Sequence, residues 1–423
     1  MSKRSLLDVL AKSFLAGEPS VEQVVARASR TLGRRWRWLR PLAQRYLAAV
    51  EGRTRPRHRD VVQFLIQDPG FQRASAKYFH ELWVDQWLTE PQQMQPVAAA
   101  LTWNVPAIES IGALDHWLSL NPNELEWFAD LKGLGYRTTR EQLRHYRYRV
   151  ALKRSGNLRL IEAPKPRLIQ LQQHILCGIL DQIPPHPAAH GFLKGRSIKT
   201  FVAPHLGQRV VLRIDLQEFF PSIGAARVQA FFRTVGYPES VAIRLGGICT
   251  NATPPDVWKK EPGFDVDSRV VQECRALYSQ RHLPQGAPTS PALANLCSYR
   301  MDCRLTGLAA SAGATYTRYA DDLAFSGDEG LELGVERFST HVAVILLEEG
   351  FRVNHRKTRI MRRGVRQHLA GLVANQRLNV RRTDFDLLKA TLHNCVRTGP
   401  ESQNRDAHPR FSRISRAGWG SSK

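Results

Sequence analysis

Apolar and polar residues alternate with two different periods along the chain. In residues 1–100 apolar positions recur at helical spacing beside a dense arginine face, as in "SVEQVVARASRTLGRRWRWLRPLAQRYLAAV". This pattern predicts amphipathic helices. Residues 146–164, "YRYRVALKRSGNLRLIEAP", instead alternate apolar and basic positions around Ser155-Gly156-Asn157, which predicts a β-hairpin.

Helical and strand patterns follow one another beyond this hairpin. "RVVLRIDLQEFF" (209–220) predicts a buried strand that ends at Asp215, and "YTRYADDLAFSG" (316–327) predicts strand–turn–strand. Residues 351–364 are expected as extended basic chain. The segments predicted to be helical are 121–135, 168–183, 289–305, with Ser290 as its cap and Pro291 at its first position, and 332–350, closed by Gly350.

The charge of the chain predicts a polyanionic partner. The 423 residues carry a formal net charge of +23, with a pI near 10.3, and nucleic acid is the commonest partner of such a surplus. An anionic membrane surface is the alternative, but the basic residues are spread along the whole chain instead of gathering on one amphipathic helix. The hydrophobic share of 43% suffices for real cores. No stretch supplies the ~20 apolar residues of a membrane span.

The N-terminus and the cysteines bear on the compartment. "MSKRSLLDVLAKSFLAGEPS" contains Asp8 and Glu18 and no small-residue cleavage site, so we interpret it as a helix of the mature protein. None of the six cysteines forms a C-x-x-C pair, which disfavours zinc. Cys297 and Cys303 fall on an apolar helical pattern and are expected in the core. A reducing cytoplasm fits this cysteine usage.

Arginines and tryptophans interleave near residue 36. The tryptophans are Trp36 and Trp38, and the arginines beside them are Arg34, Arg35, Arg37 and Arg40. One interpretation is a solvated charged face with the tryptophans packed inward. The other is phosphate contact supported by stacking. A basic connector, "GRTRPRHRD" (52–60), is expected to follow.

Two adjacent carboxylates stand between apolar arms in "TRYADDLAF" (317–325). At contact distance, two like charges repel by ~4 kcal/mol at an effective dielectric of about 20. A turn in open water or a bound cation would each offset that cost. Asp321 and Asp322 are therefore either ordinary hairpin-turn residues or ligands.

Asp215 completes a set of three carboxylates on two predicted strand ends. Alone it would more often be a turn or capping residue. Together with Asp321 and Asp322 it would suit two divalent cations, because hard Mg²⁺ takes oxygen ligands and keeps sites for substrate phosphates. Two such ions stabilise the attacking and leaving oxygens of an in-line phosphoryl displacement.

Other residues have chemistry that suits a nucleotide, although a core or surface role is the alternative for each. The ring of Phe220 could lie beneath a sugar and exclude a 2′-hydroxyl. Gly286, after Gln285, would let backbone approach a nucleotide closely. The basic candidates for the triphosphate are Lys153, Arg159 and Lys357, the last of which could also protonate the leaving pyrophosphate.

Taken in order, these segments resemble a reverse transcriptase. The blocks, which span about 150–380, are "GNLRLIEAPKPRL", "AAHGFLKGRS", "DLQEFFPSI", "LPQGAPTSPALANL", "RYADDLAF", "GFRVNHRKT" and "HLAGLVANQRLNV". Their order and spacing are similar to those of bacterial group II intron and retron enzymes. The compact length resembles a retron enzyme most.

The resemblance assigns a role to each matching position. Asp215, Asp321 and Asp322 match the catalytic metal ligands, and the backbone carbonyl of Leu216 joins them as a ligand of the two Mg²⁺ ions, with Mn²⁺ as the alternative metal. The positions matching nucleotide-binding residues are Lys153, Arg159, Phe220, Gln285, Gly286 and Lys357. The positions matching residues that support RNA template are His190, Gly191, Gly195, Arg196 and His205.

Three departures from the retron pattern are present. Retron enzymes often carry Asn-Ala-x-x-His before the first catalytic strand, and here "FVAPH" retains only His205. Near the thumb, "LAG" retains only Gly371 of a Val-Thr-Gly block, and Glu218 stands where a second aspartate is frequent. None of these departures falls on a metal ligand, so the implied polymerase chemistry is unaffected. The departures point instead to a divergent branch of the retron enzymes.

The resemblance implies an α+β, right-hand polymerase with an antiparallel palm sheet. The expected parts are a helical basic N-terminal extension (1–100), fingers (101–208), a palm (209–375) with a fingers insertion at about 236–280, and a thumb with the C-terminal tail (376–423). The arginine-rich regions 30–60 and 376–416 could hold RNA.

The implied reaction is RNA-templated DNA synthesis from deoxynucleotides. For a retron enzyme, the resemblance further implies a structured non-coding RNA partner, priming from a 2′-hydroxyl, a branched RNA–DNA product, and a role in anti-phage defence with an accessory effector. One alternative is a group II intron-like or other bacterial reverse transcriptase that acts on a different RNA. The other is a non-catalytic RNA-binding scaffold with a degenerate palm.

Overall fold

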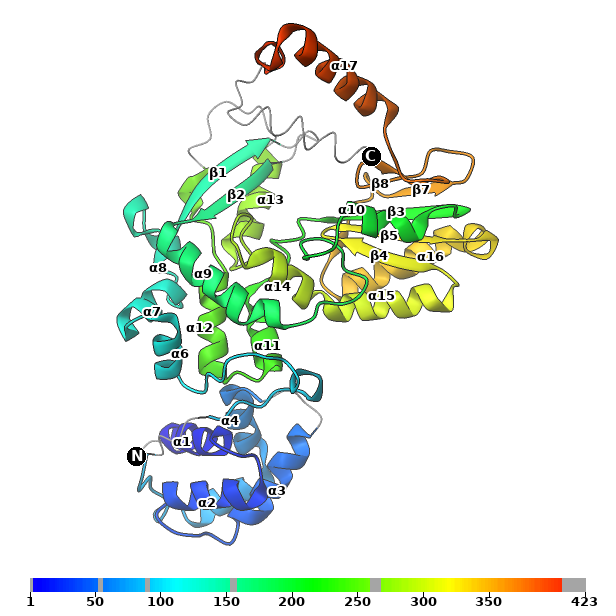
Figure 1. Cartoon of the computed structure of the whole chain (residues 1–423). Coiled ribbons are helices and arrows are strands. Elements are labelled where there is room, and N and C mark those ends of the chain that lie inside the picture. The colour runs from blue at the N-terminus through cyan, green and yellow to red at the C-terminus, as the bar shows by residue number, and fades with distance from the viewer. Residues whose placement is uncertain (1–2, 52–55, 88–91, 153–157, 259–267, 405–423) are drawn as a thin grey trace. The chain divides into compact units, whose positions relative to one another are not determined.

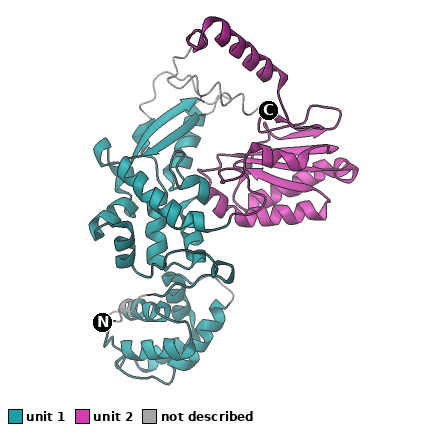
Figure 2. Cartoon of the chain, in the orientation of Figure 1, with its two compact units in different colours: residues 1–184, 223–293 teal, residues 185–222, 294–423 magenta. Residues whose placement is uncertain are grey.

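The computed structural model of the chain forms two compact units, each described here by itself (Figures 1 and 2). Unit 1 comprises residues 1–184 and 223–293, and unit 2 comprises residues 185–222 and 294–423. The residues that the structure describes are 3–51, 56–87, 92–152, 158–258 and 268–404.

Unit 1 begins with a helical bundle over residues 3–77, as the periodicity predicted, whereas the described residues 78–87 and 92–97 of the same predicted stretch form no helix. Ser20 and Asp68 accept hydrogen bonds from backbone N–H groups in the first turns of α2 and α5, so local sequence fixes where these helices start. The helices are α1 (Lys3–Leu15), α2 (Val21–Thr31), α3 (Leu39–Val50), α4 (His58–Gln67) and α5 (Pro69–Lys77). The expected connector 52–60 is shorter than predicted, because α4 already begins at His58; residues 52–55 lie outside the described part.

Trp36 and Trp38 pack inward on this bundle. Trp36 is buried, and both indoles join the apolar cluster that also contains Leu39 and Phe71. Arg34 lies over the ring of Trp36, 3.5 Å from its centroid. The inward interpretation of the tryptophans is therefore confirmed, while Arg35 and Arg37 remain exposed.

The rest of unit 1 is a hairpin surrounded by helices. Strands β1 and β2 pair antiparallel from Tyr146↔Pro164 to Leu152↔Leu158, which confirms the predicted hairpin. Asn121 and Glu124 form a capping box at the start of α7, as expected. The elements are α6 (Ile111–Leu118), α7 (Pro122–Ala129), α8 (Leu134–Arg137), β1 (Tyr146–Leu152), β2 (Leu158–Pro164), α9 (Pro166–Gly178), α11 (Ala225–Val235), α12 (Glu239–Cys249) and α13 (Ser268–Ser279).

The predicted helix 289–305 is divided at Ser298 into α14 (Ser290–Cys297) and α15 (Tyr299–Ser311). Ser290 is the first helical residue, and its hydroxyl donates to the carbonyl of Pro284 at 2.7 Å instead of capping the helix. Cys303 is exposed and Cys297 half-buried, so the prediction that both lie in the core is wrong for Cys303. None of the six cysteines, all of which lie in the described residues, forms a disulfide bond.

Unit 2 is built on a five-stranded antiparallel sheet. The strand order is β4-β5-β3-β6, and β7 pairs with β3 as well. Helices α15 and α16 pack on one face of this sheet (Figure 1), where Phe338 of α16 meets Phe325 of β5 edge-on. The elements are α10 (Ile198–Val202), β3 (Val210–Gln217), β4 (Thr315–Tyr319), β5 (Asp322–Gly327), α16 (Glu329–Glu348), β6 (Arg352–Val353), β7 (Arg359–Arg362), β8 (His368–Leu369), β9 (Leu372–Val373), β10 (Asn379–Val380) and α17 (Arg382–Thr398).

These elements confirm the α+β class and the predicted strand–turn–strand at 316–327. Gly350 follows α16 with φ +81°, the left-handed conformation that ends a helix. Strand β3 is longer than predicted: it continues past Asp215 to Gln217, because Leu216 and Gln217 pair with Val353 and Arg352 of β6. In the described residues, no helix combines the length and apolar character that crossing a membrane would require.

His205 is a core residue of unit 2. Its side chain is fully buried, with Nδ1 at 2.6 Å from the hydroxyl of Ser326 and Nε2 at 2.7 Å from the hydroxyl of Thr317. Thr317 donates to the carbonyl of Phe201, so it accepts from Nε2–H. The prediction that His205 binds RNA is therefore wrong, since no face of the ring is accessible; it ties β4 to β5 instead.

The protein should become less stable as the pH is lowered, because His205 is buried in its neutral form. Burial lowers the pKa of His205 from 6.5 to about 3, so between those values the unfolded state binds the proton and the folded state does not. The contribution of neutral His205 to the free energy of unfolding is fully present above pH 6.5. The free energy of unfolding should therefore decrease by about 2 kcal/mol between pH 7 and pH 5. Urea unfolding at both pH values measures this decrease.

His205→Gln is the matched control, since an amide keeps a donor and an acceptor and does not titrate in this range. Its stability should depend less on pH than that of the wild type. An unchanged pH dependence in this variant would assign the effect to other histidines.

Candidate active site

Three aspartates meet where β3 and β5 lie side by side. In the antiparallel register, Asp215 of β3 stands directly opposite Asp322 of β5. The backbone N–H of Leu216 donates to the carbonyl of Asp321 at 2.9 Å, which brings the third aspartate to the same point. Residues two apart share a face of a strand, so Arg213 lies on the same face of β3 as Asp215.

Cationic side chains of the protein engage two of these carboxylates. Arg213 donates to Oδ1 of Asp322 through Nε and Nη2, at 2.9 and 2.7 Å. Lys357 donates to Oδ1 and Oδ2 of Asp215, at 3.1 and 3.0 Å, and Asn354 donates to Oδ1 at 3.0 Å. Lys357, predicted to meet triphosphate, therefore lies on the first aspartate in this structure.

Asp321 has no ion-pair partner among the described side chains. Burial, together with the charges of Asp322 and Asp215, raises the pKa of Asp321 to about 6. Burial also raises the pKa of Asp322, although the guanidinium of Arg213 acts in the opposite direction. The site thus holds more negative charge than its own cations balance.

This charge excess fits a cation from outside the protein. The available donors are carboxylate oxygens, which suit Mg²⁺ or Mn²⁺, and the carboxylate of Asp321 forms no ion pair with any described side chain. In the same described part, no three His, Cys, Asp or Glu side chains are already clustered in the way that holds a metal ion. Asp215 and Asp322 point to Lys357 and Arg213 instead, so metal binding would require these carboxylates to turn from their present partners.

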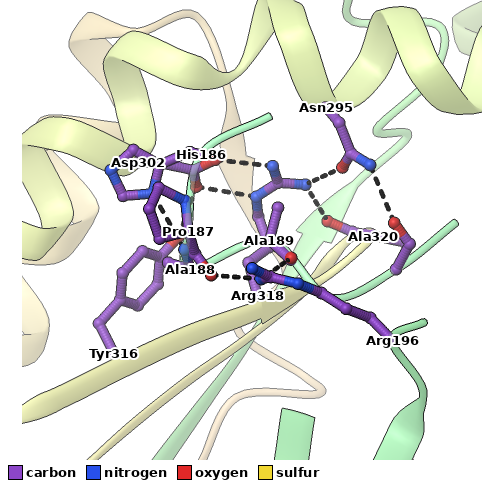
Figure 3. A network of polar contacts seen from close by, with 11 residues as sticks. His186, Pro187, Ala188, Ala189, Arg196, Asn295, Asp302, Tyr316, Arg318 and Ala320 are labelled. Atoms are coloured by element: carbon purple, nitrogen blue, oxygen red, sulfur yellow. Dashed lines mark hydrogen bonds and ion pairs between the residues drawn. The ribbon is translucent and has the colours of Figure 1, made fainter. Parts of the chain in front are cut away.

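A buried arginine supports the turn that carries Asp321. Arg318 is fully buried and donates to both oxygens of Asp302, at 2.8 and 2.7 Å. Its Nη1 also donates to Asn295 Oδ1 at 3.0 Å and to the carbonyl of Ala320 at 3.2 Å (Figure 3). Ala320 adopts φ +56°, a left-handed conformation that is unfavourable for alanine, and the guanidinium helps to hold it there.

The "HGF…GRS" block packs against this same turn. The backbone N–H of His190 donates to the carbonyl of Arg318 at 2.7 Å, and Asn295 donates to the carbonyl of Gly191 at 2.9 Å. A Cβ at Gly191 would lie 2.7 Å from the backbone nitrogen of Ala320, so only glycine fits. Arg196 donates to the carbonyls of Pro187 and Ala189 (Figure 3).

These contacts give the block a structural role beside the catalytic turn. Gly191 is buried, His190 is half-buried with Nδ1 near the hydroxyl of Thr200, and Gly195 and Arg196 are exposed. Gly195 takes φ +77°, which suits glycine. Template contact by His190, Gly195 and Arg196 stays a prediction.

Two aromatic residues follow Asp215 in the sequence by four and five positions. Phe220 is half-buried, with its ring centroid 6.1 Å from Phe192 and 5.6 Å from Phe219. Phe219 is buried and its ring packs against that of Phe351. Phe220 therefore keeps an accessible portion that Phe219 does not.

The other predicted nucleotide-binding residues belong to unit 1. The carbonyl of Gln285 accepts from the N–H of Glu162 in β2 at 2.8 Å, and a Cβ at Gly286 would lie 2.8 Å from the carbonyl of Glu162. The close backbone approach at Gly286, with φ +129°, is thus explained by the hairpin. Arg159 is exposed on β2, and Lys153 lies outside the described residues.

A buried polar network anchors this loop to the hairpin. Glu162 is fully buried and accepts from Asn251 at 2.8 Å and Thr253 at 2.9 Å, while Nε2 of His282 lies 2.9 Å from its other oxygen. Burial disfavours the charged imidazolium, but the carboxylate of Glu162 outweighs this effect and raises the pKa of His282. Glu162 and His282 therefore form an internal ion pair.

Sequence reasoning missed several residues that the structure adds. Arg213 could have been found, because it precedes Asp215 by two positions on a strand. Arg147 and Arg149 are exposed on the same face of the hairpin as Arg159, and the alternation "YRYR" was the available signal. The pairing of Arg318 with Asp302 joins distant segments and left no sequence signal.

Comparisons with known proteins agree with this geometry. A family described as "Reverse transcriptase (RNA-dependent DNA polymerase)" matches residues 151–386. The chain is 38% identical to the retron Mx65 reverse transcriptase of Myxococcus xanthus over 378 residues, which cover 89% of this chain and 76% of that protein. It is 36% identical to the retron Mx162 reverse transcriptase of the same organism, over 68% of this chain and 59% of that protein.

A third relative and a solved structure complete the comparison. The retron Ec86 reverse transcriptase of Escherichia coli is 32% identical over 59% of this chain and 70% of that protein. A foamy viral protease-reverse transcriptase in complex with double-stranded DNA aligns with 82% of this chain and 48% of its own, at 15% identity and a TM-score of 0.33. A score this low carries no argument.

Removal of the partner of Arg318 should destabilise unit 2. Asp302→Asn keeps the shape of the side chain but leaves a buried guanidinium without its counter-charge, which should lower the free energy of unfolding by ~3–5 kcal/mol. Urea unfolding measures the loss. Arg209→Gln is the control: it removes exposed ion pairs to Glu329 and Glu332 and should leave the transition nearly unchanged. An equal midpoint for both variants would show that the buried pair does not support the fold.

Proposed function

The chain belongs to the reverse transcriptase family as a retron-type, RNA-directed DNA polymerase, and from this premise we propose that Asp215, Asp321 and Asp322 are its catalytic centre. One observation carries the proposal: the register of β3 and β5 sets Asp215 opposite Asp322, with Asp321 beside them. Three aspartates at adjoining backbone positions could supply, once their side chains turn, the carboxylate ligands that in-line phosphoryl transfer needs.

The proposed reaction is attack by a primer hydroxyl on the α-phosphate of a deoxynucleotide, with pyrophosphate leaving. Two divalent ions, Mg²⁺ or Mn²⁺, would stabilise the attacking and leaving oxygens when bound. Asp215, Asp321, Asp322 and the carbonyl of Leu216 are the proposed ligands. With its pKa raised to about 6, Asp321 is mostly ionised above pH 7 and so available for this role.

The surrounding residues have proposed roles in holding the nucleotide. Lys357 contacts Asp215 now, and a cation at this position could neutralise charge on the leaving pyrophosphate or protonate it. The accessible portion of Phe220 would lie beneath the sugar and reject a 2′-hydroxyl. Gln285, Gly286, Arg159 and Lys153, which match nucleotide-binding positions of the family, are proposed to bind the incoming nucleotide.

The product and its biological role are proposals of the same kind. We infer a structured non-coding RNA as template, a 2′-hydroxyl as primer and a branched RNA–DNA product, with a role in anti-phage defence alongside an accessory effector. The names of the relatives as retron reverse transcriptases support the template class. We propose a cytoplasmic location, which fits six cysteines that form no disulfide bond in the described structure.

The division into polymerase parts is likewise proposed. We assign residues 1–100 to an N-terminal extension, 101–208 to fingers, 209–375 to the palm with a fingers insertion at about 236–280, and 376–423 to the thumb and tail. This division is based on the proposed polymerase function of each segment. The two compact units are instead defined by which residues pack together.

Loss of the paired aspartates should abolish synthesis. Asp321→Asn/Asp322→Asn should reduce dTTP incorporation on poly(rA)/oligo(dT) with Mg²⁺ roughly a hundredfold or more, because neutral amides cannot balance divalent cations. Asp328→Asn is the control, since asparagine can also cap α16. Equal incorporation by wild type and double variant would contradict the catalytic assignment.

Phe220 should control the choice of sugar. Phe220→Val should raise the kcat/KM for CTP relative to dCTP about tenfold or more, because the shorter side chain leaves room for a 2′-hydroxyl. Steady-state incorporation of each nucleotide opposite the same template base measures the ratio. If both values fall together and the ratio holds, Phe220 supports the fold and does not select the sugar.

A further inference from the structure

A basic pocket of about 530 Å³ lies on the N-terminal bundle of unit 1, away from the aspartates in sequence. Arg35 and Arg37 approach it from the segment before α3, and Arg73 and Lys77 approach it from α5. All four side chains are exposed. Its apolar walls include Trp36 and Tyr78, whose ring centroids lie 4.8 Å apart.

The positive charge of this pocket is not balanced within the described part of the chain. Arg34 pairs with Glu81 at 2.6 Å, but Arg35, Arg37, Arg73 and Lys77 have no acidic partner among the described residues. Like charges gathered around one concave surface repel one another. A bound anionic ligand would offset that repulsion. A surface that contacts only solvent would be more stable with these charges spread apart.

Exposed aromatic side chains occur in the segment that follows Tyr78 of the pocket in the sequence. Phe79, Trp83 and Trp87 are 62%, 55% and 60% exposed in the described structure. Leu82 and Val84 pack on the bundle core, so Trp83 projects to the opposite side of the segment. The backbone N–H of Asp85 donates to the carbonyl of Thr31, which fixes this segment beside the end of α2 and hence beside Arg34.

We propose that this face is a binding site for single-stranded nucleic acid, separate from the catalytic centre. The four unpaired cations would contact successive phosphates, and Trp83 and Trp87 would stack on bases. Stacking on an exposed ring requires bases without a pairing partner, which favours a single strand over a duplex. The identity of the strand, RNA template or DNA product, rests on the proposed function.

Fluorescence anisotropy of the full chain with labelled oligo(U), oligo(dT) and a duplex of the same length tests this site. Arg35→Gln/Arg37→Gln and Arg73→Gln/Lys77→Gln should each weaken oligo(U) binding about tenfold and reduce its salt dependence, because phosphate contacts release counterions. Lys12→Gln/Arg337→Gln is the matched control: it removes two exposed positive charges outside the pocket and should bind within threefold of wild type.

The aromatic contribution has its own variant. Trp83→Ala/Trp87→Ala removes exposed rings, so folding should persist, which circular dichroism checks. Single-strand binding should weaken about tenfold while duplex binding stays unchanged. Equal weakening for oligo(U) and oligo(dT) would indicate recognition of either strand, and weakening for one alone would identify which strand the site takes.

Two results would overturn the proposal. One is binding by the pocket variants equal to that of the charge-matched control. The other is unchanged oligonucleotide binding together with lost sedimentation on phosphatidylserine vesicles, which would assign the face to a membrane surface. Incorporation on poly(rA)/oligo(dT) keeps this proposal separate from the catalytic one: pocket variants that lose binding support this site whether or not the wild type makes DNA.

Discussion

The repulsion among three neighbouring carboxylates is the constraint on which the rest of unit 2 depends. The register of β3 and β5 forces Asp215 and Asp322 to face each other, and the turn before β5 adds Asp321. In this structure, Lys357 and Arg213 offset two of the charges, while burial, together with the charges of Asp322 and Asp215, raises the pKa of Asp321. A site of this kind is stable only while cations are within reach, from the protein or from a substrate complex.

The turn is held against that repulsion from behind. Arg318 spans Asp302, Asn295 and the carbonyl of Ala320 in the interior, where charge-assisted hydrogen bonds are strong and an unpaired group is costly. Gly191 packs against the backbone of Ala320 on another side. The backbone that carries Asp321 is therefore positioned by residues outside the set of three aspartates.

The sequence predicted the parts of this arrangement that have a local signature. The apolar run before Asp215 identified β3, and the apolar arms of "TRYADDLAF" identified the hairpin that contains β5. It placed the end of β3 too early, because the pairing of Leu216 with Val353 depends on a segment far along the chain. It assigned His205 to RNA because a histidine's burial is a tertiary property. It gave Gly286 the freedom for a close approach, but could not show that the approaching backbone is that of Glu162.

The buried carboxylate of Glu162 has a consequence for how such chains diverge. Its oxygens are satisfied jointly by Asn251, Thr253 and His282, from separate segments of unit 1. Losing one donor leaves a charge in the interior with too few partners, whereas exchanging the whole set for apolar side chains of matching volume can be nearly neutral. These four positions are thus expected to covary among related proteins, and few variants with a single one of them changed should be stable. This holds even though none of the four has a proposed catalytic role.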